Sequence, residues 1–169
     1  MKNEIDVVHL PPEDWKSFKQ FRLKALKTDP QAFGKSYEAE IAEPDEKWKT
    51  RLADSGKGKS WSLFAKKNNK IVGMIGAALI PDKKDEAGIY GVFVDEKHRG
   101  KGVAKKLMTH VIEELTRSGK VKKIELAVNK KQLAAVNLYK KFGFRIFNEK
   151  DQMMGNGEKV REFEMEKIL

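Results

Sequence analysis

The sequence contains no cysteine. Disulfides, thiolate metal sites and cysteine nucleophiles are therefore excluded, and a reducing compartment is favoured. Long apolar runs are also missing: the longest, Val72 to Ile80, is far shorter than the roughly 20 residues of a membrane-spanning helix. The start, Met1 to Asp6, is charged and has no apolar stretch behind it, so we expect no secretory signal. These absences predict a cytoplasmic protein without a membrane partner.

The composition is typical of a globular chain. Its 169 residues are 40% hydrophobic and 36% charged, which fits one domain over residues 1–169 with its own core. The formal net charge of +10 is compatible with nucleic-acid binding, or with a lysine-rich solvated surface that also attracts anionic ligands. Because lysines are scattered through every segment and no zinc-finger spacing is present, we favour the second interpretation and expect no specific nucleic-acid partner.

Apolar periodicity predicts elements in the order β-α-α-β-β-β-α-β-α-β-β, which is a single α/β domain on a mixed sheet. No internal repeat, linker or low-complexity tract interrupts it. A turn is expected at Asn68-Asn69, and a long polar connection is expected between the last two strands. The predicted strands are Ile5–Leu10, Ser60–Lys66, Ile71–Ile80, Gly88–Val94, Ile124–Val128, Phe144–Asn148 and Val160–Lys167. The predicted helices run from about Trp15 to a stop at Thr28-Asp29-Pro30, over Tyr37–Ala42, over Pro44–Asp54 with Pro44 in the first turn, from the glycine loop at residue 100 to about Ser118, and over Leu133–Phe142.

A glycine loop joins the strand Gly88–Val94 to an amphipathic helix. After Asp95–His98 it reads Arg99-Gly100-Lys101-Gly102-Val103-Ala104. A loop at the start of a helix presents free backbone N–H groups at the positive end of the helix dipole, and this favours a phosphate or diphosphate. The glycines let the ligand approach, Ala104 keeps the next turn small, and Lys101, Lys105 and Lys106 add positive charge. Simple turn chemistry is the alternative.

Two other phosphate loops do not fit the sequence. The spacing G-x-G-x-x-G fails because position 105 is Lys105. The tripeptide Gly58-Lys59-Ser60 resembles the end of a P-loop, but the earlier glycine is replaced by Ala53 and a strand follows instead of a helix.

The segment Arg99–Ala104 resembles the Gln/Arg-x-x-Gly-x-Gly/Ala signature of the GCN5-related N-acetyltransferases. Some forty residues later, Ala135-x-x-Leu138-Tyr139-x-x-x-Gly143-Phe144 resembles the second motif of that family. The predicted element order is similar to the family fold over nearly the whole chain. The resemblance implies a single-domain mixed-sheet acyl-CoA N-acyltransferase (GNAT) fold.

The resemblance also implies a cofactor and its contacts. Acetyl-CoA is the expected co-substrate, without a metal, and an amine is the expected acceptor. The strand Val92, Phe93, Val94 would face the pantetheine arm, with the Val94 N–H as the expected oxyanion donor; plain core packing is the alternative. The diphosphate would be cradled by Arg99, Gly100, Lys101, Gly102, Val103, Ala104 and Lys105.

Tyr139 takes the family's general-acid position; core packing on an apolar helix face is the alternative, and we favour the catalytic role. Two positions depart from the family. Gln132 replaces a frequent asparagine that contacts the cofactor, and Ala127 replaces a glutamate that serves some members as base. Glu125 is the nearest carboxylate on the same strand face and is the candidate base; a surface role, or no protein base, is the alternative.

The acceptor side is less defined. Three aromatic residues lie among acidic ones, a combination that would attract an amine or polyamine; a solvated helix face is the alternative. Small amines, amino-acid derivatives and protein amines, and acyl groups other than acetyl, are not distinguished. An acyl-CoA sensor without turnover is a second hypothesis, and a homodimer is compatible with the family. The residues concerned are Phe33, Tyr37 and Trp48 with Glu38, Glu40, Glu43, Asp45 and Glu46.

Overall fold

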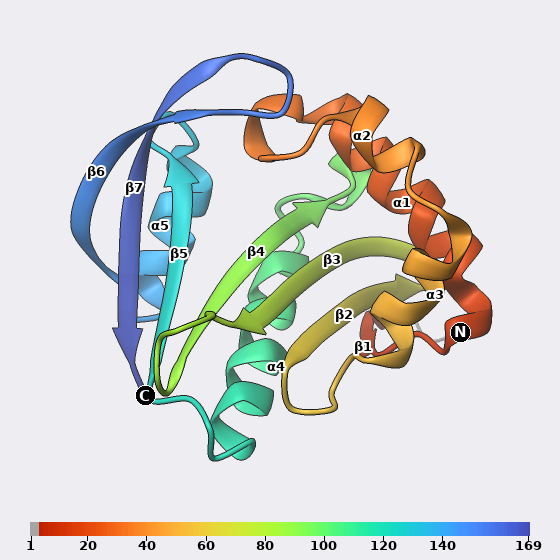
Figure 1. Ribbon diagram of the computed structural model, residues 1–169, viewed down its shortest axis with the longest axis horizontal. Helices are drawn as coiled ribbons and strands as arrows, with labels where there is room; N and C mark the ends of the chain where they lie inside the picture. The colour runs from red at the N-terminus through yellow and green to blue at the C-terminus, as the bar shows by residue number, and fades with distance from the viewer. Residues whose placement is uncertain (1–3) are drawn as a thin grey trace.

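A seven-stranded mixed sheet in the order β1-β2-β3-β4-β5-β7-β6 runs through the protein (Figure 1). The computed structural model describes residues 4–169; the expectation about the start of the chain rests partly on residues 1–3, which lie outside the described residues. The strands are β1 Asp6–Val8, β2 Ser60–Lys67, β3 Lys70–Leu79, β4 Glu86–Val94, β5 Lys123–Asn129, β6 Arg145–Met153 and β7 Lys159–Ile168. The helices are α1 Trp15–Thr28, α2 Tyr37–Ile41, α3 Asp45–Ala53, α4 Val103–Arg117 and α5 Leu133–Lys141, with single turns η1 Pro12–Asp14, η2 Pro30–Ala32 and η3 Glu96–His98.

The predicted element order is confirmed, and so is the turn at Asn68-Asn69, where both residues have positive φ (49° and 63°). The prediction of a long connection between the last two strands was wrong. Strand β6 continues to Met153 and pairs in register with β7, for example Asp151 with Arg161. Because β6 is an exposed edge strand, its second half is polar and lacks the apolar alternation that marks a buried strand. Pro44 is the N-cap of α3 and not part of its first turn.

The two faces of the sheet carry separate cores. On one face α1 and α3 bury Phe18 and Trp48 against Phe64 of β2. On the other face α4 buries one side along its length, including Leu107 and Leu115, which are fully enclosed. Each such leucine stabilises the fold by about 1.5–3 kcal/mol. The pleat of the strands explains the division, since successive side chains point to opposite faces.

Helix α4 approaches the sheet closely at Gly73 of β3. A Cβ at Gly73 would lie 3.0 Å from side-chain atoms of both Val103 and Leu107. Gly73 is also the register partner of Val94. The missing side chain therefore allows the N-terminus of α4 to sit beside the end of β4.

Strands β4 and β5 separate after a short parallel contact. Their pairing covers only residues 86–88 of β4 and 123–125 of β5, ending at Gly88 with Glu125. Beyond this point the facing edges of both strands have no strand partner within the described chain. Strand β4 also bulges at Gly91, which has φ of 63° and lies where the register with β3 shifts. The separation opens the sheet at its centre (Figure 1).

None of the helices in residues 4–169 has the length and apolar character needed to cross a membrane.

Candidate functional site

A cavity of about 640 Å³ occupies the opening between β4 and β5. Its walls come from the free part of β4, from the middle of β5, from the glycine loop and from one side of α5. Nearly all of the predicted cofactor residues line it. They are Val92, Phe93, Val94, Arg99, Gly100, Gly102, Val103, Ala104, Lys105, Gln132 and Tyr139.

Lys101 and Glu125 are the predicted site residues that do not line the cavity. Lys101 is exposed, and its ammonium donates to the backbone oxygen of Lys97 at 2.8 Å, within the loop. Its charge therefore stays close to the loop although its side chain is not part of the wall.

The glycine loop is shaped to receive an anion. Gly100 and Gly102 have φ of 71° and 79°, and a Cβ at either position would meet no atom within 4 Å. Gly102 is the N-cap of α4 and offers no side-chain cap. Within residues 4–169 no oxygen accepts from the backbone N–H groups of Val103, Ala104 and Lys105. Free donors at a helix N-terminus, with open space in front of the glycines, fit a diphosphate.

Arg99 braces this loop. Its Nε donates to the backbone oxygen of Val94 at 2.9 Å, its Nη2 bonds Oδ2 of Asp29 at 2.7 Å, and its guanidinium lies 5.5 Å from the centre of the Phe93 ring. Arg99 thus connects the end of β4, the end of α1 and the start of the loop.

Asp95 fixes the entry to the loop. Its Oδ1 accepts from the backbone N–H of Lys97 at 3.1 Å and caps η3, and its Oδ2 accepts from the ammonium of Lys24 on α1. The hydrogen bond from Lys24 has the largest effect and, with that from Lys97, holds the pKa of the Asp95 carboxyl below its usual range. Burial of the carboxyl, which raises its pKa, is the smaller effect.

Phe93 and Val94 of β4 line the cavity although their side chains are buried. Phe93 packs edge-on against Phe21 of α1, whereas Val94 belongs to the core under α4. Asp95 N–H donates to the Val72 oxygen of β3 at 2.9 Å. Because successive N–H groups of a strand point to opposite edges, the N–H of Val94 points away from β3 and toward the opening. Core packing and cofactor contact are therefore compatible at these positions.

Tyr139 lies on α5 with 6% of its surface exposed. Its ring packs edge-on against Phe144 at 6.2 Å, and no hydrogen bond to its hydroxyl is formed within residues 4–169. Burial raises the pKa of Tyr139 to about 12. The phenol therefore keeps its proton at neutral pH, as a general acid requires.

Glu125 lies below the opening, where β4 and β5 still pair. Its carboxylate accepts from Lys83 at 3.0 and 3.1 Å, and Lys123 lies 3.1 Å away. Burial disfavours the charged form, but the two lysines outweigh it and hold the pKa of Glu125 below its usual range. The structure does not bring Glu125 to the cavity, whereas Ala127, two residues on, lines it.

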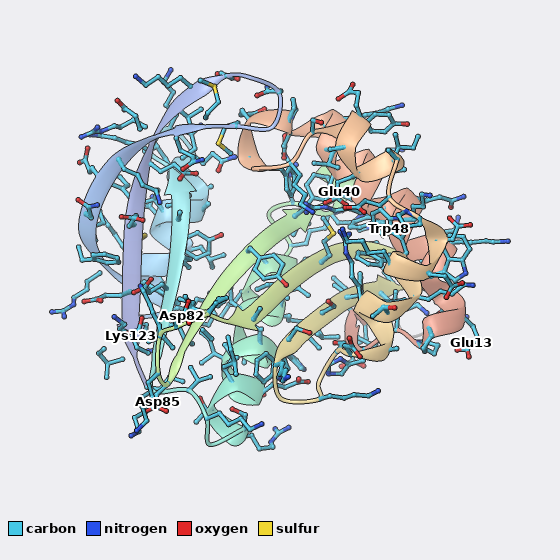
Figure 2. All side chains as sticks on the ribbon, viewed as in Figure 1. Glu13, Glu40, Trp48, Asp82, Asp85 and Lys123 are labelled. Carbon is cyan, nitrogen blue, oxygen red and sulfur yellow. The ribbon has the colours of Figure 1, made fainter. Side chains whose placement is uncertain are left out.

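The cation-attracting patch, which was one of the two interpretations for the residues around Trp48, is not formed. Trp48 and Glu40 are 0% and 2% exposed and lie on the inner side of the helices (Figure 2). Glu40 is paired with Arg22 and Arg51, its Oε2 accepting from Arg51 at 3.0 Å. Other acids of this segment also form ion pairs with lysines: Glu43, between α2 and α3, with Lys47, and Glu46 and Asp45 of α3 with Lys49 and Lys19. Lys47, Lys49 and Arg51 belong to the same stretch of sequence as these acids, whereas Arg22 and Lys19 come from α1. The burial of Trp48 and Glu40 is what the sequence pattern does not show.

Sequence reasoning missed the wall of the cavity on the α1 side. Tyr90 and Gly91 of β4, with Asp29 and Ala32 after α1, line it. A glycine inside a strand is a signal for a bulge, and Gly91 has that role. Nothing in the sequence pattern links the end of α1 to β4.

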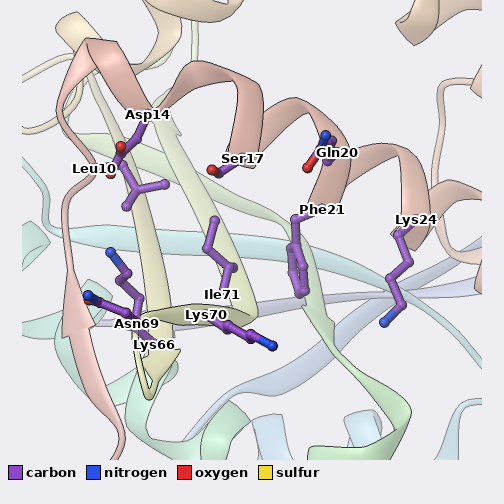
Figure 3. Close-up of a pocket in the computed structure, with 10 residues that line it drawn as sticks. All are labelled: Leu10, Asp14, Ser17, Gln20, Phe21, Lys24, Lys66, Asn69, Lys70 and Ile71. Carbon is purple, nitrogen blue, oxygen red and sulfur yellow. The ribbon is translucent and has the colours of Figure 1, made fainter.

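A second groove of about 620 Å³ lies between α1 and the turn that joins β2 to β3 (Figure 3). It is lined by side chains such as Ser17, Gln20, Lys66 and Lys70, without a glycine loop or free helix N-terminus. The convergence of predicted residues favours the opening between β4 and β5 as the functional site. Within residues 4–169 no group of His, Asp or Glu side chains is placed to hold a metal ion.

The sheet opens beside a glycine loop whose N–H groups at the start of α4 are free within the described chain. Residues 22–144 match the Acetyltransferase (GNAT) family, and the chain belongs to this family. Its fold is similar to that of a GNAT-family acetyltransferase from Streptococcus pneumoniae, with a TM-score of 0.85 and 22% identity over 98% of this chain and 99% of that one. It is also similar to yncA, a putative acetyltransferase from Salmonella typhimurium solved with acetyl-CoA, with a TM-score of 0.80 and 16% identity over 98% and 94% of the chains.

Curated relatives match over different lengths. The spermine/spermidine N(1)-acetyltransferase of Bacillus subtilis is 40% identical over 68 residues, which is 40% of this chain and 43% of the relative. The L-amino acid N-acetyltransferase AaaT of Escherichia coli is 27% identical over 98% of this chain and 99% of its own. The first of these matches thus covers less than half of the relative.

Proposed function

We propose that this protein is an N-acetyltransferase that moves the acetyl group of acetyl-CoA to an amine by direct attack. One observation carries the proposal: the backbone N–H groups of Val103 to Lys105, free within the described chain, line the cavity where β4 and β5 separate. Membership of the acetyltransferase family supports the same reaction.

The residues divide into a diphosphate cradle and a strand that orients the cofactor. The amides from Gly100 to Lys105 and the ammonium of Lys105 would hold the diphosphate. The free edge of β4 from Val92 to Val94 would hydrogen-bond the pantetheine arm, and Gln132, half-buried at the start of α5, would contact the arm from the other side. The N–H of Val94 would donate to the thioester oxygen as negative charge develops there.

Acetyl-CoA supplies the thioester, whose carbon–sulfur bond breaks as the amine nitrogen bonds the carbonyl carbon. Tyr139 would donate its proton to the departing sulfur, and its buried, protonated hydroxyl supports this role. We leave Glu125 out of the proton path because two lysines hold its carboxylate outside the cavity. Ala127 offers no carboxylate, so no side chain on β5 is assigned as base; the proton lost by the amine would pass to water in the cavity, and Tyr139 would recover from water the proton that it gives to sulfur.

The finer properties belong to the same proposal. Residues 1–169 would act as one domain in the cytoplasm, without specific nucleic-acid or membrane partners. A homodimer is supported by apolar side chains on the edge strand β6, where Ile146 and Phe147 are 38% and 47% exposed. Sedimentation and cell fractionation would test these points.

The function is tested by incubating the purified protein with acetyl-CoA and a panel of amines, following free thiol and the mass of the acetylated product. Product that depends on both protein and amine supports the proposal. Tight binding of acetyl-CoA without turnover of any amine would overturn it in favour of a sensor.

A further inference from the structure

Arg22 on α1 is a buried cation with few partners. Its side chain is 15% exposed and its guanidinium lies 4.6 Å from the centre of the Phe33 ring. Within residues 4–169 its one side-chain hydrogen bond goes to Oε1 of Glu40 at a long 3.5 Å. A guanidinium carries five N–H donors, and burying it with a single weak acceptor is unfavourable unless a ligand supplies more.

Glu40 is already neutralised by another residue. Its Oε2 accepts from Arg51 at 3.0 Å, and Lys35 lies 4.0 Å from its Oε1. The acids of this cluster, Glu40 and Glu43, face the cations Arg22, Arg51, Lys35 and Lys47. Positive charge is therefore in excess, and Arg22 is the most buried of these four cations, with one long contact to Glu40.

Arg22 lies against the cavity wall. A Cβ built on Gly91, which lines the cavity, would be 3.2 Å from Nη1 of Arg22. The preceding wall residue, Tyr90, is 53% exposed, and its hydroxyl makes no hydrogen bond within the described chain. The guanidinium of Arg22 therefore lies directly behind Gly91 of the cavity wall, close to the phenol of Tyr90, which lines the cavity.

This pair lies on the other face of the sheet from the diphosphate cradle. Tyr90 pairs with Gly76 and its ring lies over that glycine, on the face that carries Phe93 and α1. The adjacent Ile89 points into the core under α4. Since the cradle is the N-terminus of α4, the Arg22–Tyr90 pair faces the side from which the acceptor would enter.

We propose that Arg22 and the hydroxyl of Tyr90 bind a carboxylate on the acceptor, so that the substrate is an amino acid carrying a free amine and not a polyamine. This inference rests on the proposed acetyl transfer. A guanidinium binds a carboxylate through paired, charge-assisted hydrogen bonds. A polyamine would instead bring cations to a wall that already holds excess positive charge.

The test compares kcat/KM for L-amino acids, for their methyl esters and for spermidine. We expect the wild-type protein to prefer each amino acid to its ester by about 10- to 100-fold, the range of a charged hydrogen-bonded pair. Arg22→Met should raise KM for the amino acid and remove the preference, while leaving kcat/KM for the ester nearly unchanged. Tyr90→Phe should reduce the preference by a few-fold.

Two controls keep the result interpretable. Arg117→Met removes an exposed arginine at the end of α4 and should leave the preference intact. Arg22→Lys keeps the positive charge beside Glu40 but lacks the paired N–H donors of a guanidinium. It should retain the fold and part of the preference for the amino acid over its ester. Equal use of acid and ester, or a preference for spermidine, would overturn the carboxylate site while leaving acetyl transfer in place. Absence of turnover with every acceptor would overturn the proposed function instead, and thermal-shift binding of the amino acids in the presence of coenzyme A would still report on Arg22.

Discussion

Arg99 and Asp29 form an ion pair, with Nη2 of Arg99 2.7 Å from Oδ2 of Asp29. The two residues are 70 positions apart in the chain. Asp29 follows α1, where it lines the cavity, and Arg99 opens the glycine loop. The pair therefore connects the end of α1 to the start of the glycine loop across the cavity wall.

Asp29→Asn should weaken acetyl-CoA binding only a few-fold. The pair is partly exposed, and such pairs contribute about 0–1 kcal/mol; Arg99 also keeps its hydrogen bond to Val94. Calorimetric titration at low and high salt would measure the loss, which should shrink as salt screens the pair. Asp151→Asn, at an exposed ion pair on β6, is the matched control and should leave affinity unchanged.

Gly102→Glu should abolish acetyl-CoA binding. The new side chain would stand in the open space before α4 with a charge that repels a diphosphate, at a residue with φ of 79°. Gly119→Glu is the matched control, because Gly119 also has positive φ (66°) and open surroundings but lies after the other end of α4. Isothermal titration on both folded variants decides the matter: if Gly102→Glu bound acetyl-CoA as the wild type does, the cradle would be misplaced.

Tyr139→Phe should lower kcat by roughly 10²-fold or more with little change in cofactor affinity, in line with the loss of a general acid. Because burial raises the pKa of Tyr139 to about 12, the phenol stays protonated below that pH. Deprotonation of Tyr139 should therefore not limit kcat of the wild-type protein between pH 7 and about 10. Tyr37→Phe, at a tyrosine of α2 outside the cavity, serves as control. Equal kcat in Tyr139→Phe and wild type would reduce Tyr139 to a packing residue.

Glu162→Gln should stabilise the fold at neutral pH. Glu162 is 8% exposed, and within residues 4–169 no ion pair or hydrogen bond reaches its carboxylate; burial raises its pKa. An acid with a raised folded-state pKa loses stability as pH rises from its unfolded pKa through the folded one. The gain from the neutral amide should therefore appear at neutral pH and vanish in acid.

The neighbour on the same strand gives the opposite expectation. Glu164 accepts from Lys150 at 2.6 Å and from Asn148 at 2.7 Å, and these bonds hold its pKa low. At pH values above the unfolded-state pKa of the carboxyl, Glu164→Gln should therefore have a lower melting temperature than the wild type. The difference should disappear as the pH falls through the folded-state pKa. Melting curves of both variants across pH 4–8 would measure whether the melting temperature rises in Glu162→Gln and falls in Glu164→Gln. A lower melting temperature of Glu162→Gln at neutral pH would show that the carboxylate of Glu162 has a stabilising partner.

Local patterns predicted what depends on local geometry. The apolar stripe of α4, the turn at Asn68-Asn69 and the order of elements all follow from side-chain periodicity and from residues that tolerate positive φ. The second half of β6 was missed because a polar edge strand is held by its neighbour β7 and not by its own burial. Because pairing with a neighbouring strand also decides where a strand ends, the predicted ends of the elements were less accurate than their order.

By itself the sequence determined the glycine loop and the placement of free N–H groups at the start of α4, since both follow from consecutive residues. Only the tertiary structure decided which charges remain without partners. Glu125 is bound by Lys83 from another segment, Glu40 is neutralised by Arg51, and Arg22 is left beside Gly91 at the cavity wall. Ion pairing depends on distance in space and on burial, and neither is encoded in the spacing of residues along one element.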